Sequence, residues 1–140
     1  MNRTDRRLFH AALAEDWAEA LATGAYRWST RGRTLDEEGF THLSYADQLD
    51  GVVERFYADV DSLVLLVIDP DRLTDAVVDE PPAPGVVEHF PHLYGPIPLD
   101  AVVRTVQWSA SSGMAPSAAV GVDDPPSGDP PSGGASAAPS

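Results

Sequence analysis

The sequence predicts an α+β domain whose strands pair antiparallel, rather than a doubly wound parallel sheet. The apolar patterning runs strand, helix, strand, helix and then mostly strands. Short turns rich in proline and glycine separate the later strands, which suits hairpins better than helical crossovers. Neither G-x-G-x-x-G nor G-x-x-x-x-G-K-[ST] occurs, so neither a Rossmann fold nor a P-loop is signalled.

The first third of the chain is predicted to form one amphipathic helix among short strands. Residues 12–22 repeat apolar side chains at helical spacing, namely Leu13, Trp17, Ala20 and Leu21. Gly24 follows, where a glycine commonly ends a helix in the left-handed conformation. The flanking segments are interpreted as a strand at 7–11, a short strand at 26–30, a polar loop at 31–38 and a second short strand at 40–43.

The middle of the chain has the clearest helix and the clearest strand. Residues 45–58 place five apolar side chains on one stripe, namely Leu49, Val52, Val53, Phe56 and Tyr57. Ser44 is expected to be the N-cap of this helix, with Asp47 in the place of the usual capping-box glutamate. The apolar run 62–69 is bounded by Pro70 and predicts a central strand buried on both faces.

The last third is expected to contain three more strands. Two weak strands, 76–78 and 86–89, flank the turn EPPAPG. The segment 90–99 carries three prolines and a glycine, so we expect an ordered irregular loop there. Residues 100–108 form the last predicted strand.

The folded domain is predicted to span residues 6–108. Residues 109–140 contain six of the 13 prolines, five of the 11 glycines and no aromatic residue. Such a Pro/Gly/Ser/Ala-rich segment cannot bury enough apolar surface to order itself, so we expect a disordered tail. The tail carries three acidic residues and no basic one, which leaves about −10 of the net charge of −13 on the domain.

Composition excludes several classes of function. There is no cysteine, which removes disulfides, cysteine-ligated metals and thiol nucleophiles. All nine basic residues are arginine, so a Schiff-base or P-loop lysine is absent. The negative charge argues against nucleic-acid binding. No apolar run approaches the roughly 20 residues of a membrane span, and the N-terminus does not look like a secretory signal, so a cytoplasmic protein without membrane partners is expected.

Four histidines are the main candidates for chemistry: His10, His42, His89 and His92. A metal site is disfavoured because Pro91 separates the closest pair and no H-E-x-x-H motif exists. Nucleophilic catalysis by Ser44 is disfavoured because no G-x-S-x-G elbow exists. The remaining interpretation is a pocket in which neutral imidazole and tyrosine bind a flat polar ligand such as a nucleotide.

Paired carboxylates are treated as solvated surface, including Glu37/Glu38 and Asp79/Glu80. Glu88 is the exception, because it precedes His89 and the loop that carries His92 and Tyr94, and is therefore expected to reach the same pocket.

Four segments resemble the bacterial domain-of-unknown-function 952 family over about residues 7–106. They read RLFHAALAEDWAEALATGAY, EEGFTHLSYADQLDGVVERFY, SLVLLVIDPDRL and HFPHLYGPIPLDAVV. Thr41 and Leu43 stand where that family usually has Ile and Cys, so a buried Thr41 would need a hydrogen-bond partner.

That family looks related to the ADP-ribosyltransferase superfamily. The resemblance implies a split antiparallel β-core with two N-terminal helices that holds NAD, as substrate, in a cleft. It implies that His10 contacts the ribose or the nicotinamide amide, and that His42 is a second cleft histidine beside Ser44. His92 and Tyr94 would close the cleft, and Glu88 is the candidate for the catalytic carboxylate, acting with His42.

Three functions are compatible with these residues. The first is a transferase or glycohydrolase that cleaves NAD, with a small molecule or a protein as acceptor. The second is a non-catalytic module that binds a nucleotide or another metabolite in the same cleft. The third is an adaptor that recruits a partner through the tail.

Overall fold

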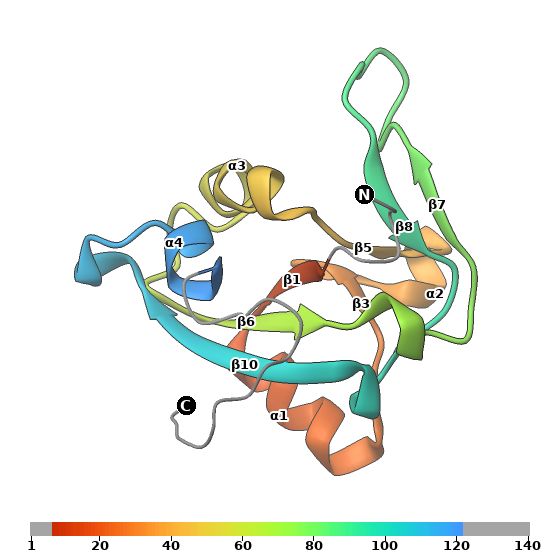
Figure 1. The fold of residues 1–140 in the computed structure, drawn as a ribbon, viewed down its shortest axis with the longest axis horizontal. Coiled ribbons are helices and arrows are strands. Elements are labelled where there is room, and N and C mark those ends of the chain that lie inside the picture. Colours follow the sequence, from red (N-terminus) through yellow and green to blue (C-terminus); the bar gives the residue numbers. More distant parts are fainter. Residues whose placement is uncertain (1–6, 122–140) are drawn as a thin grey trace.

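The computed structural model describes residues 7–121, which are built around a three-stranded antiparallel sheet (Figure 1). Its central strand is β6 (Ser62–Ile68), flanked by β1 (Leu8–Ala12) and β10 (Val102–Ser109). All six residues after Ser62 in β6 are buried. The predicted α+β class and the central, doubly covered strand are both confirmed.

Helices cover both faces of this sheet. Successive β6 side chains alternate between the faces. Val64, Leu66 and Ile68 join the cluster that receives α1 (Ala14–Thr23). Leu63, Leu65 and Val67 join the cluster that receives α3 (Ala46–Phe56). The two long N-terminal helices that the sequence predicts are therefore confirmed, and each packs on its own side of the strand.

A second three-stranded sheet, in the order β5-β8-β7, carries most of the candidate site residues. Its strands are β5 (Thr41–His42), β7 (Val77–Glu80) and β8 (Phe90–Leu93). The hairpin from β7 to β8 stands out from the body on the same side as α3, and we call it the β-arm (Figure 1). Buried Thr41 donates its hydroxyl hydrogen to the carbonyl oxygen of Gly95 at 2.8 Å, so it has the partner it requires.

Short elements complete the described chain. Two-stranded pairs join β2 (Ala25–Tyr26) to β9 (Ile97–Pro98) and β3 (Trp28–Thr30) to β4 (Arg33–Thr34). The remaining helices are α2 (Leu35–Glu38), η2 (Pro70–Arg72), η3 (Leu99–Ala101), η4 (Ala110–Ser112) and α4 (Pro116–Gly121). Within residues 7–121, no helix has the length and apolar character needed to cross a membrane.

Two predicted loops contain regular structure instead. The segment 31–38 holds β4 and α2, and α2 begins with a capping box in which Thr34 and Glu37 bond to each other's backbone N–H. The segment 90–99 holds β8 and β9. Proline was expected to prevent strand pairing there, but Pro91 contributes only its carbonyl, which accepts from the N–H of Leu43 at 3.0 Å.

The predicted strand at 86–89 is wrong, because β8 begins only at Phe90. The apolar pair Val86–Val87 suggested a strand, but Val87 is 89% exposed and has no strand partner among the described residues.

The predicted start of the disordered tail at residue 109 also differs from the structure. Residues 110–121 form η4 and α4, and α4 packs against α3 (Figure 1). Val120 is fully buried, and the Asp50 carboxylate accepts from the N–H and the hydroxyl of Ser117 at 2.8 and 2.7 Å. The segment lacks aromatic residues, but it completes a core formed by other elements. Residues 122–140 lie outside the described range.

Candidate functional site

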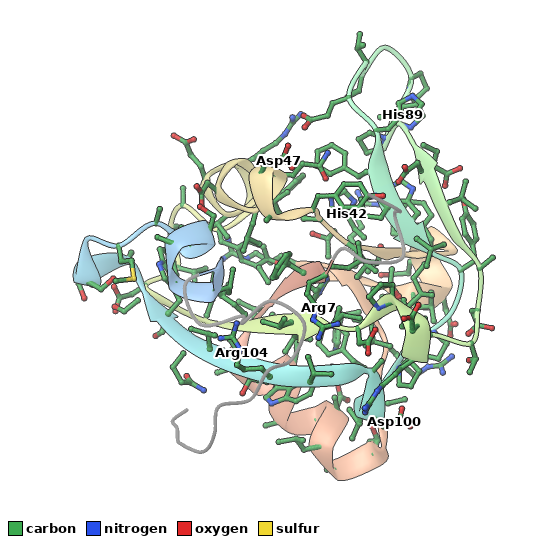
Figure 2. All side chains as sticks on the ribbon, viewed as in Figure 1. Arg7, His42, Asp47, His89, Asp100 and Arg104 are labelled. Carbon is green, nitrogen blue, oxygen red and sulfur yellow. The ribbon has the colours of Figure 1, made fainter. Side chains whose placement is uncertain are left out.

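A cavity of about 560 Å³ lies between α3, β5 and the β-arm. Its wall is mixed: Phe40, Phe56 and Phe90 contribute three aromatic rings, and about half of the lining residues are polar or charged. His42 lines it from β5 and Glu88 from the β-arm loop, so the two residues predicted to be catalytic lie on one cavity. Figure 2 shows Asp47 on α3, His42 nearby on β5, and His89 farther along the β-arm.

His42 is held as a neutral imidazole among aromatic rings. Its ring centroid lies 4.9 Å from that of Phe90 and 6.5 Å from that of Phe56. Burial lowers the pKa of His42 to about 3, and the nearby His92 and His10 lower it further in the same direction. The buried Nε2 atom of His42 has no hydrogen-bond partner among the described residues.

His10 supports His42 from behind and does not line the cavity. Its Nδ1–H donates to the backbone carbonyl oxygen of His42 at 2.7 Å. Its Nε2 then accepts from the hydroxyl of Tyr26 at 2.9 Å, which fixes the tautomer. Burial lowers the pKa of His10 to about 4, against the opposing effect of the bond to His42. Both ring nitrogens are therefore hydrogen-bonded within the protein. His10 has no free nitrogen for the direct ligand contact that the resemblance implies.

His92 lies beside His42, because the two residues face each other in the β5–β8 pair. Their ring centroids are 5.3 Å apart. The His92 ring stacks on Phe40 at 3.9 Å, with an interplanar angle of 11°. Its Nδ1–H donates to Glu80 Oε2 at 2.8 Å, whereas its buried Nε2 has no partner in the described part of the chain. His92 therefore lies behind His42 and is not part of the cavity wall.

Tyr94 bonds to the same carboxylate as His92. Its hydroxyl donates to Glu80 Oε2, and the hydrogen bonds from Tyr94 and then His92 lower the pKa of Glu80. Tyr94 is 44% exposed and does not line the cavity. The sequence predicts solvated surface for Glu80 because it belongs to an acidic pair, and no sequence signal indicates that it orients a histidine.

Ser44 has a structural role that differs from both predictions for it. It is buried, and its backbone exchanges two 2.8 Å hydrogen bonds with Phe9. It neither lines the cavity nor caps α3. The N-cap is Tyr45, whose N–H donates to Gln48 Oε1 at 3.1 Å, so the helix starts one residue later than expected.

Gln48 connects α3 to the β-arm across the cavity. Its amide nitrogen donates to Glu88 Oε2 at 3.1 Å and to the carbonyl oxygen of His89 at 2.7 Å. These bonds hold Glu88 on the cavity wall, as the sequence predicted for a shared pocket. His89 itself is exposed and lies outside the cavity.

The sequence did not predict the remaining polar residues of the cavity wall. Ser29 lines the cavity, is 1% exposed, and its Oγ has no partner among residues 7–121. Arg33 lines it too, but is paired with Glu38 at 2.6 Å. Gly51 and Arg55 contribute from α3. Their only sequence signal is the i, i+4 spacing from Asp47, which places all three on one face of the helix.

The arrangement suits binding of a flat ligand with polar edges. Aromatic rings offer stacking surfaces, and a neutral imidazole can donate or accept one hydrogen bond. Within residues 7–121, no three His, Asp or Glu side chains gather as a metal site requires.

Comparison with known proteins gives a family and a fold. The model of the family described as "Protein of unknown function (DUF952)" matches residues 11–105. Two solved structures of protein CC0527 from Caulobacter crescentus are similar to this chain. The crystal structure has a TM-score of 0.62 at 26% identity and covers 72% of this chain and 84% of that one. The solution NMR structure has a TM-score of 0.59 at 25% identity, with coverages of 75% and 88%. No curated protein matches.

Proposed function

The chain belongs to the DUF952 family of proteins of unknown function, and from its site we propose that the domain binds a nucleotide, with NAD as the first candidate. One observation carries the proposal: an uncharged His42 stands among phenylalanine rings at a cavity of about 560 Å³. That volume falls within the range of about 300–1,000 Å³ typical of small-molecule sites. The net charge of −13 favours a small molecule over a nucleic acid as partner.

The chemistry of the wall matches the parts of a nucleotide. Phe90 and Phe56 offer faces on which a base or a nicotinamide ring can stack. His42 supplies a hydrogen bond to a ribose hydroxyl or an amide, and its lowered pKa keeps that group uncharged at neutral pH.

Calorimetric titration with NAD, ADP-ribose and AMP tests the proposal. We expect saturable binding by the full chain and at least a tenfold loss of affinity in His42→Ala, because the variant removes both a ring contact and a hydrogen bond. His89→Ala is the matched control, since His89 is exposed and lies outside the cavity. Absence of saturable binding to all three ligands, or equal losses in the two variants, would contradict the proposal.

Transfer of ADP-ribose is the second candidate, favoured by the position of Glu88 on the same cavity as His42. A carboxylate stabilises the cationic sugar that forms as nicotinamide leaves C1′. His42 would orient the ligand rather than transfer protons, because a pKa of about 3 makes it a poor acid or base at neutral pH.

Release of nicotinamide from NAD separates this candidate from the non-catalytic module, whichever acceptor attacks. We expect Glu88→Gln to reduce the release rate at least a hundredfold while NAD still binds. Glu54→Gln removes an equal charge from the exposed side of α3, outside the cavity, and is expected to leave the rate unchanged. Binding without any release above the buffer rate identifies the non-catalytic module.

A further inference from the structure

Arg55 differs from the other arginines between residues 7 and 121. Each of the other six bonds to a carboxylate or a backbone carbonyl within the protein. Arg55 pairs with none of the described carboxylates, and its guanidinium carbon lies 5.7 Å from the centre of the Phe56 ring. An arginine without a carboxylate is unexpected in a chain with 22 acidic and nine basic residues.

The unpaired guanidinium belongs to the cavity described above. Arg55 lines it together with Gly51 and Asp47, at four-residue intervals along α3. A helix rises 1.5 Å per residue, so Asp47 and Arg55 stand about 12 Å apart at opposite ends of this wall. The other arginine of the wall, Arg33, is neutralised by Glu38 at 2.6 Å.

Ser29 is a second group in the cavity wall that lacks a partner. Its hydroxyl is buried and bonds to nothing among residues 7–121. A buried hydroxyl without a partner is uncommon, because its desolvation is then uncompensated. An oxygen-rich ligand would supply the missing acceptor.

We propose that Arg55 binds a phosphate group of the ligand at the C-terminal end of α3 and so sets which way the ligand lies in the cavity. This inference rests on the proposed nucleotide binding and adds the position of the charge. A guanidinium matches phosphate oxygens in a bidentate geometry. The base or nicotinamide ring then points toward Asp47 and Glu88, at the other end of the wall.

A role confined to helix stability would also place an arginine here. Arg55 lies in the last turn of α3, where a cation interacts favourably with the helix dipole. That role predicts a small loss of stability in a variant and no change in the preference between ligands, so ligand preference is the discriminating measurement.

The test compares AMP with adenosine, which differ only by the phosphate, on the full chain. We expect the wild type to prefer AMP, and Arg55→Gln to lose about tenfold of that preference while it keeps its affinity for adenosine. Arg55→Lys should retain part of the preference. Arg27→Gln removes an equal charge from an arginine that pairs with Asp36 outside this cavity, and should retain all of it. An unchanged preference in Arg55→Gln, or an equal loss in Arg33→Gln, overturns the assignment.

Inorganic pyrophosphate separates failure of this inference from failure of nucleotide binding. If neither AMP nor adenosine binds the wild type, the proposed function fails, and a pyrophosphate titration followed by amide chemical shifts still tests Arg55. Saturable shifts at Arg55 and Phe56 that vanish in Arg55→Gln support the anion site. Absence of these shifts in the wild type overturns it.

Discussion

At the scale of single residues, the three clustered histidines differ in what their ring nitrogens contact. His10 uses both nitrogens inside the protein, His92 bonds to Glu80, and His42 reaches the cavity. They were expected to line one cleft together. The structure brings them together, but only His42 forms part of the cavity wall.

The buried His10 makes stability depend on pH. Its pKa is about 4 in the folded state, against an ordinary value of 6.5. Between these values the unfolded chain binds more protons, so stability rises with pH through this window and is lost as pH falls from about 6.5 toward 4. The shift corresponds to about 3 kcal/mol for this group. Above pH 6.5 its contribution is constant.

Urea unfolding between pH 7 and 4.5 measures this effect. We expect His10→Asn, whose amide nitrogen can take the place of Nδ1, to be less stable at pH 7 by about 1–2 kcal/mol through loss of the bond to Tyr26. Its stability should also fall less steeply with decreasing pH than that of the wild type. His89→Asn, at an exposed position, serves as the control. Parallel pH profiles for His10→Asn and the wild type would show that His10 does not contribute to the pH dependence.

At the scale of elements, α3 packs on the central sheet with one face and lines the cavity with another. Leu49 and Val53 pack on the central sheet, while Gly51 and Arg55 face the cavity. A glycine inside a helix costs about 0.5–1 kcal/mol relative to alanine. The backbone of Gly51 does not require a positive φ, and an added Cβ meets no atom within 4 Å. Stability therefore does not explain the glycine, whereas the proposed ligand would use the space that a side chain would fill.

Substitution of Gly51 should separate stability from binding. We expect Gly51→Ala to increase the free energy of unfolding by about 0.5–1 kcal/mol through helix propensity. Gly51→Leu should keep the fold and weaken nucleotide binding at least tenfold, because its side chain occupies the cavity. Thermal denaturation and calorimetric titration provide the two readouts. Ala46→Leu adds the same side chain at an exposed position of α3 outside the cavity, and its binding should match that of the wild type.

At the scale of the whole molecule, strongly patterned elements were predictable and irregular ones were not. The β6 run and the stripe of α3 contain their own periodicity, so both were located to within one or two residues. The strands β8 and β9 contain prolines and show no such periodicity. These strands form because neighbouring strands pair with them. The helix α4 was missed for a related reason: Val120 is buried by α3 and β6, not by its own segment.

The candidate site was predictable in part. His42 and Glu88 were expected to share a pocket, and both line the cavity. His10, Ser44, His92 and Tyr94 were expected to contact the ligand, but they lie behind or beside the wall. Ser29, Gly51 and Arg55 were not expected, because the spacing of Gly51 and Arg55 from Asp47 indicates one helix face but not the surface that this face meets.

By itself, the sequence determined the α+β class, the central strand, the two main helices and the short list of residues able to do chemistry. These depend on local periodicity and composition, which each segment carries alone. Only the tertiary structure decided which of those residues reach the cavity. That outcome depends on the pairing register that sets His42 opposite His92, and on contacts that occupy His10 and leave Arg55 without a carboxylate among residues 7–121. Such contacts join segments far apart in the chain, so no single segment encodes them.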